Sequence, residues 1–398
     1  MAHQRQRLLQ AQILKSIKHS PIVGIVGQRQ TGKTTLTESL VSGERYVSLD
    51  QAVQLAAART NPEAFLDRGT TLFGIDECQL APELFPALKE AVRVLKKPGR
   101  FLLTGSVRFT SRKIIRESLT GRIVTHELLP LCIAELNDYK LGDVVNFLRL
   151  SLSEMQKICK NKIQLISEKS VADYLLKGGL PGICFFRDPH VRAERFNAHL
   201  DTLLRRDIQL VLETTLPFEK LFKTMQYFAF NQGKPLSISE LSRFTRISAP
   251  SLRKLVPALE ALFLIRRIET IGDRKKEIFF LEDQGMASFL TPRIDAEVDL
   301  LRFVFSQCLA QIKYLHPHSS IRSYETRGGA RVPLVLDVSG KMTGLIPTTL
   351  ETPDTTAIAS AESFLRRNPK AVVAILTRGK VVVPLSSKII IVPYRAIV

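Results

Sequence analysis

The segment from Ile22 to Thr34 constrains the fold of this 398-residue chain more than any other. Ile22–Val26 reads IVGIV, a short apolar run of the kind expected for a buried parallel strand. It leads directly into GQRQTGKT (27–34), and the residues that follow, TLTESLV, have a helix-like pattern. The sequence therefore predicts a strand, a glycine-rich loop and a helix in that order, which indicates an α/β fold with a parallel sheet.

The loop matches the pattern G-x-x-x-x-G-K-[ST] at every fixed position. Gly27 and Gly32 let the backbone turn its N–H groups toward phosphate oxygens, Lys33 reaches the β and γ phosphates, and Thr34 places a hydroxyl on Mg²⁺. The helix N-terminus adds a favourable dipole. We therefore predict that ATP and Mg²⁺ bind at Gly27, Gln28, Arg29, Gln30, Thr31, Gly32, Lys33, Thr34 and Thr35.

A second apolar run, TTLFGI, ends in Asp76-Glu77. A second parallel strand would deliver these carboxylates to its carboxyl edge, beside the phosphate loop. Asp76 would then hold Mg²⁺ through water, and Glu77 would orient or activate the attacking water. The alternative is an acidic pair that only complements the dipole of a helix start; the phosphate loop upstream favours the catalytic interpretation.

A third strand is predicted at Arg100–Thr104, so Thr104 and Ser106 would lie at a strand edge where a polar side chain can sense the γ-phosphate. Turn chemistry alone also explains a Gly-Ser pair at that place. The following stretch is rich in arginine, and a ring-forming ATPase needs an arginine supplied by a neighbouring subunit. The residues of this stretch that could serve, or be ordinary surface charges, are Arg108, Arg112, Arg116 and Arg122.

Six segments together resemble one known family. They are GQRQTGKTTL (27–36), YVSLD (46–50), NPEAFL (61–66), IDECQLAPELFPALK (75–89), RFLLTGS (100–106) and ESLTGR…LLPL (117–131). Their combination resembles the bacterial and archaeal AAA+-type ATPases. More narrowly, it resembles the group whose core precedes a C-terminal domain of unknown function with a restriction-endonuclease-like tail.

The resemblance extends over most of the chain and implies ATP binding and hydrolysis. It implies that Gly27, Gly32, Lys33 and Thr34 form the phosphate loop, and that Asp76 and Glu77 are the metal and water carboxylates. By the same analogy, the sensor-like residue is Thr104 or Ser106. The arginine that acts on a neighbouring subunit is then Arg122, which stands in the Gly-Arg step of the family.

Residues 135–185 have apolar positions at helical spacing and end at the stop signal GGLPG (178–182), so we expect a helical lid. Many AAA+ proteins carry a second sensing arginine at this point, which GGLPG does not supply. Residues 190–212 predict one amphipathic helix, whose Arg205-Arg206-Asp207 resembles the Arg-Asp-Ile step of the family. A solvated helix face with i,i+4 ion pairs explains these three residues at least as well.

Residues 218–290 have the rhythm of a winged helix: three helical stretches and then two strands joined by IGDRKK (271–276). Ser237 or Ser239 can cap the second helix and Ser248 the third. Winged helices also serve as packing modules, and Pro257 predicts a kink in the third helix. If this unit reads DNA, the contacting residues are Arg253, Lys254, Arg274, Lys275 and Lys276.

The last hundred residues alternate strands with one helix-like stretch, an α/β pattern. The resemblance implies a nuclease-like fold, whose chemistry needs an acidic residue on one strand and Glu-x-Lys on the next. Here Arg331-Val332-Pro333 and Thr348-Thr349-Leu350 replace the family's Glu-Val-Asp and Glu-Val-Lys. We therefore predict an inert domain retained for binding or assembly, with Asp337 and Glu351 as surface residues.

The composition indicates a globular protein that meets a polyanion. Apolar residues make up 45% and charged residues 24%, and 21 Gly and 20 Pro exclude collagen-like and disordered classes. The 57 Lys and Arg against 38 Asp and Glu give a net charge of +19, spread along the chain rather than collected in a tail. Five cysteines without a C-x-x-C pair suggest neither a disulfide framework nor a zinc site. No apolar stretch is long enough to span a membrane, so we expect a cytoplasmic protein.

These observations predict a Mg²⁺-dependent ATPase of four parts: a P-loop core (1–134), a helical lid (135–215), a winged helix (216–291) and a degenerate nuclease-like domain (292–398). We expect it to couple its nucleotide state to DNA binding or remodelling as a homo-oligomer. The alternative is a nucleotide-gated switch or scaffold that binds a protein partner and turns ATP over slowly. A role in mobile-element defence or as a toxin rests on family analogy alone.

Overall fold

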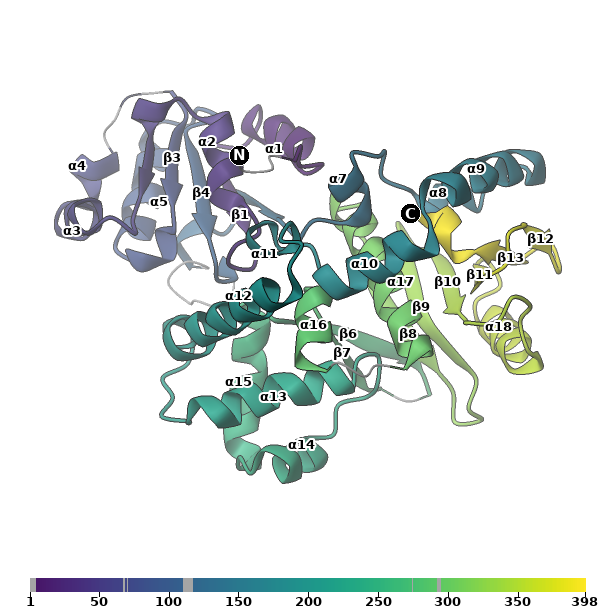
Figure 1. Cartoon of the computed structure of the whole chain (residues 1–398). Helices are drawn as coiled ribbons and strands as arrows, with labels where there is room; N and C mark the ends of the chain where they lie inside the picture. The colour runs from purple at the N-terminus through teal and green to yellow at the C-terminus, as the bar shows by residue number, and fades with distance from the viewer. Residues whose placement is uncertain (1–4, 67–68, 70, 110–116, 274, 292–294) are drawn as a thin grey trace.

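The computed structural model describes residues 5–66, 69, 71–109, 117–273, 275–291 and 295–398. These residues form an α/β protein with two sheets that lie on opposite sides of the molecule (Figure 1). The predicted α/β class with a parallel-sheet core is confirmed. Across the described ranges, no helix is long and apolar enough to cross a membrane.

The first sheet is parallel throughout, in the strand order β2-β3-β4-β1-β5. All five residues of β1 are buried, and alternate side chains enter hydrophobic clusters on the two faces of the sheet, which explains the unbroken apolar run. The elements of this part are α1 (Gln10–Ile17), β1 (Ile22–Val26), α2 (Lys33–Leu40), η1 (Gly43–Arg45), β2 (Tyr46–Ser48), α3 (Ala52–Thr60), α4 (Pro62–Leu66), β3 (Phe73–Asp76), η2 (Cys78–Leu80), α5 (Leu84–Val94), β4 (Phe101–Gly105) and β5 (Ile123–Glu127).

The middle of the chain is helical, as the sequence predicts for residues 135–185. The helix predicted over 190–212 is present as far as Leu210, but it is not α-helical throughout: α12 ends at Asp201, and a π-helical turn and a 3₁₀ turn follow it. The wider π turn changes the direction of the side chains that follow, and Asp207, just beyond it, is fully buried. The elements are α7 (Ile133–Asn137), α8 (Val144–Phe147), α9 (Leu152–Leu165), α10 (Glu168–Lys177), α11 (Pro181–Cys184), α12 (Pro189–Asp201), η4 (Thr202–Arg206) and η5 (Asp207–Leu210).

Three helices and an antiparallel hairpin follow. Ser237 and Ser248 cap the second and third helices, as the sequence predicts, and α15 continues through Pro257. An isolated bridge joins Pro235 to Ile278 of the hairpin. This is the order of elements on which the winged-helix prediction depends. The elements are α13 (Phe218–Phe230), α14 (Ile238–Thr245), α15 (Ala249–Ala261), β6 (Ile265–Gly272), β7 (Glu277–Leu281) and α16 (Gln284–Leu290).

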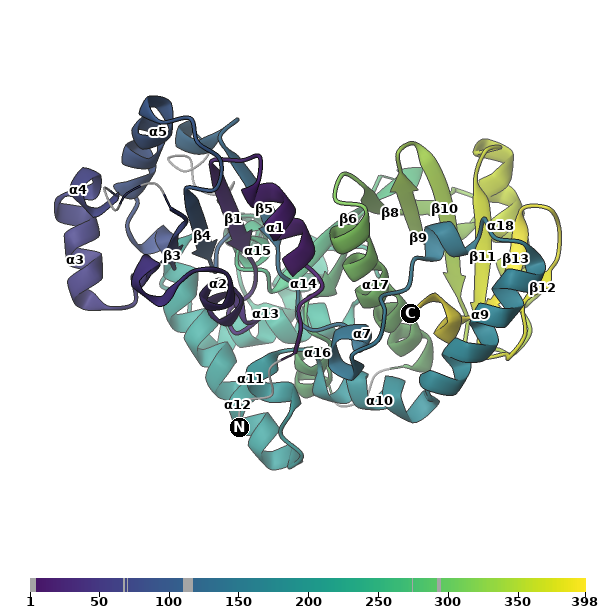
Figure 2. The same ribbon diagram turned by 90° about the horizontal axis from the view of Figure 1, so that it is seen from above.

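The hairpin is part of the second sheet, which has the order β12-β13-β11-β10-β9-β8-β6-β7 and mixed strand directions. Because β6 pairs in parallel with β8, hydrogen bonds cross the predicted boundary between residues 291 and 292. Figure 2 shows α9 and α18 beside the C-terminal strands. The remaining elements are α17 (Ala296–Leu315), β8 (Ser320–Glu325), β9 (Arg331–Val338), β10 (Lys341–Pro347), α18 (Thr355–Arg367), β11 (Val372–Thr377), β12 (Val383–Pro384), β13 (Ile389–Pro393) and η6 (Tyr394–Ile397).

A buried network of charges joins the two sheets. Glu127, at the end of β5, accepts hydrogen bonds from Arg266 of β6 and pairs with Lys313 of α17 at 2.8 Å and with Arg108 at 3.3 Å. Arg266 also pairs with Glu282 at 2.5 Å. Buried charges are tolerated only when they are matched in this way. The network therefore fixes the carboxyl end of β5 against the second sheet.

The backbone of residues 128–131 contacts four other parts of the chain. An added Cβ on Gly27 would lie 2.2 Å from the Leu128 carbonyl oxygen, and one on Gly179 would lie 2.1 Å from that of Leu131. Arg7 Nη2 donates to the Leu129 carbonyl at 2.6 Å, and the Leu129 N–H donates to the Tyr314 hydroxyl at 3.1 Å. The phosphate loop, the N-terminal segment, α17 and the Gly178-Gly179 step thus meet at one segment.

We expect Gly179→Ala to destabilise the protein by about 1–3 kcal/mol, because backbone cannot move aside as a side chain can. The measurement is the denaturation midpoint in urea. Gly43→Ala is the matched control, because a Cβ added there meets no atom within 4 Å; it should change the free energy of unfolding by less than about 0.5 kcal/mol. Equal midpoints for the two variants would contradict the close approach.

Candidate active site

The phosphate loop lies between the end of β1 and the start of α2, with Gln30 and Gly32 at positive φ of 66° and 93°. Left-handed residues of this kind turn successive N–H groups toward one side and form an anion-binding concavity. Gly27 is required by its approach to the Leu128 carbonyl. In the described structure no side chain caps α2, so the first N–H groups of this helix face the loop and can bind an anion.

Lys33 is buried, and its Nζ donates to the carbonyl oxygens of Gly27 and Gln28, both at 3.0 Å. Burial lowers the pKa of Lys33, and the charges of Glu77 and Asp76 offset part of that effect. The two carbonyls hold the ammonium group over the loop. A phosphate seated on the loop would therefore meet a positive charge that is already in place.

Asp76 accepts three hydrogen bonds at the carboxyl end of β3. Thr34 Oγ1 donates to its Oδ2 at 2.8 Å, Tyr46 OH donates to the same atom at 2.9 Å, and Thr104 donates to Oδ1. The hydroxyl of Thr34 and the carboxylate of Asp76 are the oxygen ligands that Mg²⁺ prefers. Nowhere in the described ranges do three or more His, Cys, Asp or Glu gather as a ready-made metal site. The pair thus fits Mg²⁺ held jointly by protein and phosphate oxygens.

Glu77 has a left-handed backbone, with φ 54° and ψ 40°, a conformation that costs energy in a non-glycine residue. Its N–H donates to Thr104 Oγ1 at 3.1 Å, and its Oε2 accepts from Ser106 at 3.0 Å and from Gln79. Burial raises the pKa of Glu77, but the charge of Lys33 and these two side-chain hydrogen bonds outweigh it and lower the pKa overall. The carboxylate is thus ionised at neutral pH and able to orient water.

The structure therefore brings together six of the predicted residues at one edge of the first sheet, because the carboxyl ends of β1, β3 and β4 meet there. Thr104 and Ser106 each hydrogen-bond one of the two carboxylates. The six are Lys33, Thr34, Asp76, Glu77, Thr104 and Ser106.

The predicted trans-acting arginine lies elsewhere. Arg122 immediately precedes β5, whose first residue pairs with Ile22 at the amino end of β1, so it lies at the sheet edge opposite the phosphate loop. Its Nη1 donates to the Thr120 carbonyl at 3.2 Å. A role on a neighbouring subunit stays a prediction. Arg108 belongs to the buried network around Glu127, and Arg112 and Arg116 lie outside the described residues.

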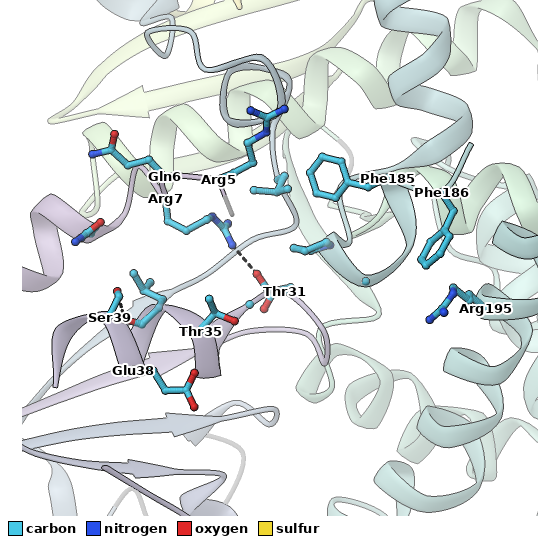
Figure 3. A pocket seen from close by; sticks show the side chains of 16 residues that line it. Arg5, Gln6, Arg7, Thr31, Thr35, Glu38, Ser39, Phe185, Phe186 and Arg195 are labelled. Carbon is cyan, nitrogen blue, oxygen red and sulfur yellow. Dashed lines mark hydrogen bonds between the residues drawn. The ribbon is translucent and has the colours of Figure 1, made fainter. Parts of the chain in front are cut away.

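A cavity of about 920 Å³ adjoins the phosphate loop on the side of α2 (Figure 3). Thr31 and Thr35 line one wall, and Phe185 and Phe186 line the opposite one. Arg195 lies over the Phe186 ring, 4.1 Å from its centroid. The volume suits a small ligand, and the aromatic and cationic wall suits a nucleobase. These wall residues carry no motif, so single-sequence reasoning missed them.

Other residues around the loop were also missed. Arg7 is buried, donates from Nη1 to the Thr31 carbonyl at 2.5 Å and pairs with Glu135 at 3.0 Å. His199 Nε2 lies 3.5 Å from Gln28 Nε2. Arg7 and His199 have no sequence signal of their own. Tyr46 and Gln79, which hold the two carboxylates, lie within YVSLD and IDECQ and could have been found from those segments.

The residues predicted to contact DNA are placed as follows. Arg253 and Lys254 are exposed on α15, and Lys275 is exposed in the β6–β7 turn. Lys276 Nζ pairs with Glu325 Oε1 of β8 at 3.0 Å, so the charge of Lys276 is compensated within the second sheet. Arg274 lies outside the described residues.

Comparison with known families and proteins agrees with this site. Residues 19–137 match the model of an AAA domain, and residues 168–291 match that of a domain of unknown function (DUF8612). The chain is 26% identical over 401 residues to the uncharacterized protein Rv2008c of Mycobacterium tuberculosis, covering 96% of this chain and 82% of the relative. The domain match and the loop geometry support an AAA+-type P-loop ATPase.

Two solved structures are also similar. The Walker-type ATPase of Pyrococcus abyssi has a TM-score of 0.40 and 14% identity, covering 71% of this chain and 94% of that protein. A RuvB variant of Thermotoga maritima has a TM-score of 0.31 and 16% identity, covering 65% and 88% respectively.

The buried imidazole of His199 should make the free energy of unfolding depend on pH. Burial, with the charges of Arg29 and Lys33, lowers the pKa of His199 to about 3. In the unfolded chain it takes up a proton near pH 6.5, so between these values the unfolded state binds one proton more and stability falls as the pH drops. Relative to His199→Gln, the unmodified protein should lose about 1.5 kcal/mol more between pH 6.5 and pH 5.

Urea unfolding at a series of pH values measures this difference. His190→Gln, at an exposed position of the same helix, is the matched control and should keep the pH dependence of the unmodified protein. Parallel curves for the unmodified protein and His199→Gln would contradict a buried, neutral imidazole.

Proposed function

We propose that this protein is a Mg²⁺-dependent ATP hydrolase. The observation that carries the proposal is the arrangement at the carboxyl edge of the first sheet. A buried lysine lies over the phosphate loop, and Asp76 and Glu77 beside it are each hydrogen-bonded to the hydroxyl of a β4-end residue. Phosphoryl transfer needs positioning and charge neutralisation more than covalent chemistry, and this arrangement supplies both.

Each residue has a definite task in this proposal. Lys33 and the N–H groups of the loop hold the β and γ phosphates, and Thr34 with Asp76 holds the metal. Bound Mg²⁺ neutralises charge that develops on the phosphate oxygens. Glu77, ionised and aimed by Gln79 and Ser106, orients the attacking water. The nucleoside occupies the cavity beside α2.

Lys33→Ala should lower ATP hydrolysis at least about a hundredfold and weaken binding of ATP and ADP alike, because it removes the charge over the loop. Glu77→Gln should lower kcat by about 10²–10⁴ while ATP binding persists, because only water activation is lost. Phosphate release and equilibrium nucleotide binding separate the two effects. Lys89→Ala, at an exposed site on α5, is the control. Unchanged phosphate release by Lys33→Ala would refute the assignment.

We propose further that the nucleotide state is coupled to DNA, and that the protein acts as a homo-oligomer. The net charge of +19 and the exposed Arg253, Lys254 and Lys275 support a polyanionic partner. Arg122, at the sheet edge away from its own phosphate loop, can act on a triphosphate only in another subunit. An arginine from a neighbouring subunit can stabilise charge in the transition state of phosphoryl transfer, so the position of Arg122 supports the proposed oligomer.

Binding of duplex DNA should weaken steeply as salt rises, because phosphate contacts release counterions. The double variant Arg253→Ala/Lys254→Ala should reduce the slope of log K against log salt by about 2. Lys157→Ala/Lys160→Ala, which removes two exposed charges from α9, is the matched control and should leave the slope unchanged. A shallow slope in the unmodified protein, without stimulation of ATPase by DNA, would favour a switch that binds a protein partner.

The C-terminal sheet enters this proposal as a binding or assembly module. Asp337 of β9 accepts from the Gly340 N–H at 3.0 Å and lies 3.9 Å from Arg322. Arg331, at the other end of β9, donates to the Gly233 carbonyl. These side chains are used in turns and packing contacts, which supports an inert domain.

A further inference from the structure

Arg29 lies within the phosphate loop, but its guanidinium points to a carboxylate far along the chain. Arg29 Nη1 is 3.5 Å from Asp207 Oδ2. The side chain of Asp207 is 1% exposed, whereas that of Arg29 is 25% exposed. The loop is therefore tied to the segment η4–η5 by one ion pair whose basic partner retains access to solvent.

The carboxylate of Asp207 is incompletely satisfied. Its Oδ1 accepts from Arg206 Nε at 3.0 Å, but in the described structure Oδ2, the atom nearest Arg29, has no hydrogen-bond partner. A buried carboxylate oxygen without a hydrogen bond is costly, and in native proteins such groups often mark functional positions. Arg29 at 3.5 Å attracts this oxygen without saturating it, so the pair can be exchanged for a stronger one.

Two side chains in the same contact are also incompletely hydrogen-bonded in the described part of the chain. Gln28 Oε1 and His199 Nδ1 are also buried without a hydrogen bond among the described residues, and the two side chains meet at 3.5 Å. Gln28, Arg29, His199 and Asp207 thus form an under-bonded polar contact between the phosphate loop and the α12–η5 segment. The π turn Thr202–Arg206, a rare conformation that recurs at functional sites, immediately precedes Asp207.

Arg29 also lies within the electrostatic reach of the catalytic groups. Its charge lowers the pKa of Lys33 and of Glu77, although burial is the largest influence on both. A guanidinium pairs with phosphate oxygens through two parallel hydrogen bonds, and such charge-assisted bonds are stronger than a single loose ion pair. A terminal phosphate near Lys33 therefore competes with Asp207 for Arg29.

We propose, on the basis of the proposed function, that Arg29 contacts the terminal phosphate of a nucleoside triphosphate bound to its own chain. Asp207 is the positioning residue that holds Arg29 aside until then. ATP takes the guanidinium from Asp207, and ADP, which lacks the γ-phosphate, leaves the ion pair intact. Asp207 then keeps the hydrogen bond from Arg206 and its attraction to Lys33.

The segment around Asp207 packs in the same hydrophobic cluster as helices α13, α14 and α15. Leu203, Leu204 and Ile208, which flank Asp207, belong to the same hydrophobic cluster as Met225 and Phe228 of α13. A change at Asp207 therefore acts on a segment that packs directly against α13. Because Arg29 leaves Asp207 when a triphosphate binds but not when a diphosphate binds, the packing of this segment can differ between the ATP-bound and the ADP-bound protein.

The test is equilibrium binding of ATP and of ADP, with Mg²⁺, measured in a Glu77→Gln background so that ATP persists. Arg29→Ala should weaken ATP at least about tenfold and change ADP by less than about threefold. Asp207→Asn should strengthen ATP several-fold without changing ADP, because it removes the competitor. In the Arg29→Ala background, Asp207→Asn should have no effect on ATP, since the group for which it competes is absent.

Arg205→Ala is the matched control, because Arg205 pairs with Asp201 on an exposed surface; it should change neither affinity. The double variant Arg29→Ala/Asp207→Asn removes both charges and so separates misfolding from the phosphate effect. Equal losses of ATP and ADP on Arg29→Ala, or an Asp207→Asn effect that persists without Arg29, would show an ion pair that only stabilises the fold and overturn the inference. Failure of the Glu77→Gln protein to bind either nucleotide would overturn the proposed function and this inference with it.

Discussion

The structure depends on the backbone of residues 128–131, where the phosphate loop approaches too closely for any residue but glycine. Gly27 lies against the Leu128 carbonyl and Gly179 against that of Leu131, and the Leu131 N–H donates to the Gly179 carbonyl at 2.7 Å. Backbone packed against backbone has no side-chain freedom to absorb a displacement, so these contacts transmit movement rather than damp it. The shape of the phosphate loop and the position of the helices after Gly179 are therefore set by the same four residues.

Two buried charge clusters extend this coupling toward the second sheet. Arg7 joins the Thr31 carbonyl of the phosphate loop to Glu135 and lies within 3.4 Å of the Tyr314 hydroxyl on α17. The network around Glu127 joins the end of β5 to β6 and α17. Removing one partner of a buried pair leaves an uncompensated charge, which costs far more than the pair contributes. The clusters thus make the separation of the core from the second sheet costly and favour concerted movement of the two.

Local pattern was enough to predict the elements of the core and the residues that gather at the carboxyl edge of its sheet. The strand, loop and helix around Gly27–Thr34, the carboxylates at Asp76 and Glu77, and the caps Ser237 and Ser248 depend on neighbours in sequence, and the structure has all of these elements. The pairing of β6 with β8, the burial of Asp207 and the reach of Arg7 depend on partners 24 to 178 residues away. Nothing in a single sequence marks such partners. The helix expected over 190–212 is present as a helical stretch from Pro189 to Leu210, but its geometry changes from α to π and 3₁₀ after Asp201. Local propensity does not predict this change or the ion pair of Asp207 with the distant Arg29.

The positive charge of the chain is also distributed differently from what the composition alone implies. Several buried arginines are paired with nearby acids, as with Arg7 and Glu135 or Arg302 and Asp299, whereas the buried Arg192 donates to the backbone carbonyls of Phe186 and Arg187. Acidic side chains more than offset the two basic ones at the phosphate site, because Lys33 and Arg29 face Asp76, Glu77 and Asp207. In the proposed function, a triphosphate is therefore held by local groups, namely the N–H groups of the loop and the cations Lys33 and Arg29, rather than by the net charge of the whole chain. The part of the net +19 that is open to a polyanion therefore includes Arg253 and Lys254 of α15 and Lys275 of the β6–β7 turn, which are exposed, but not Lys276, which pairs with Glu325.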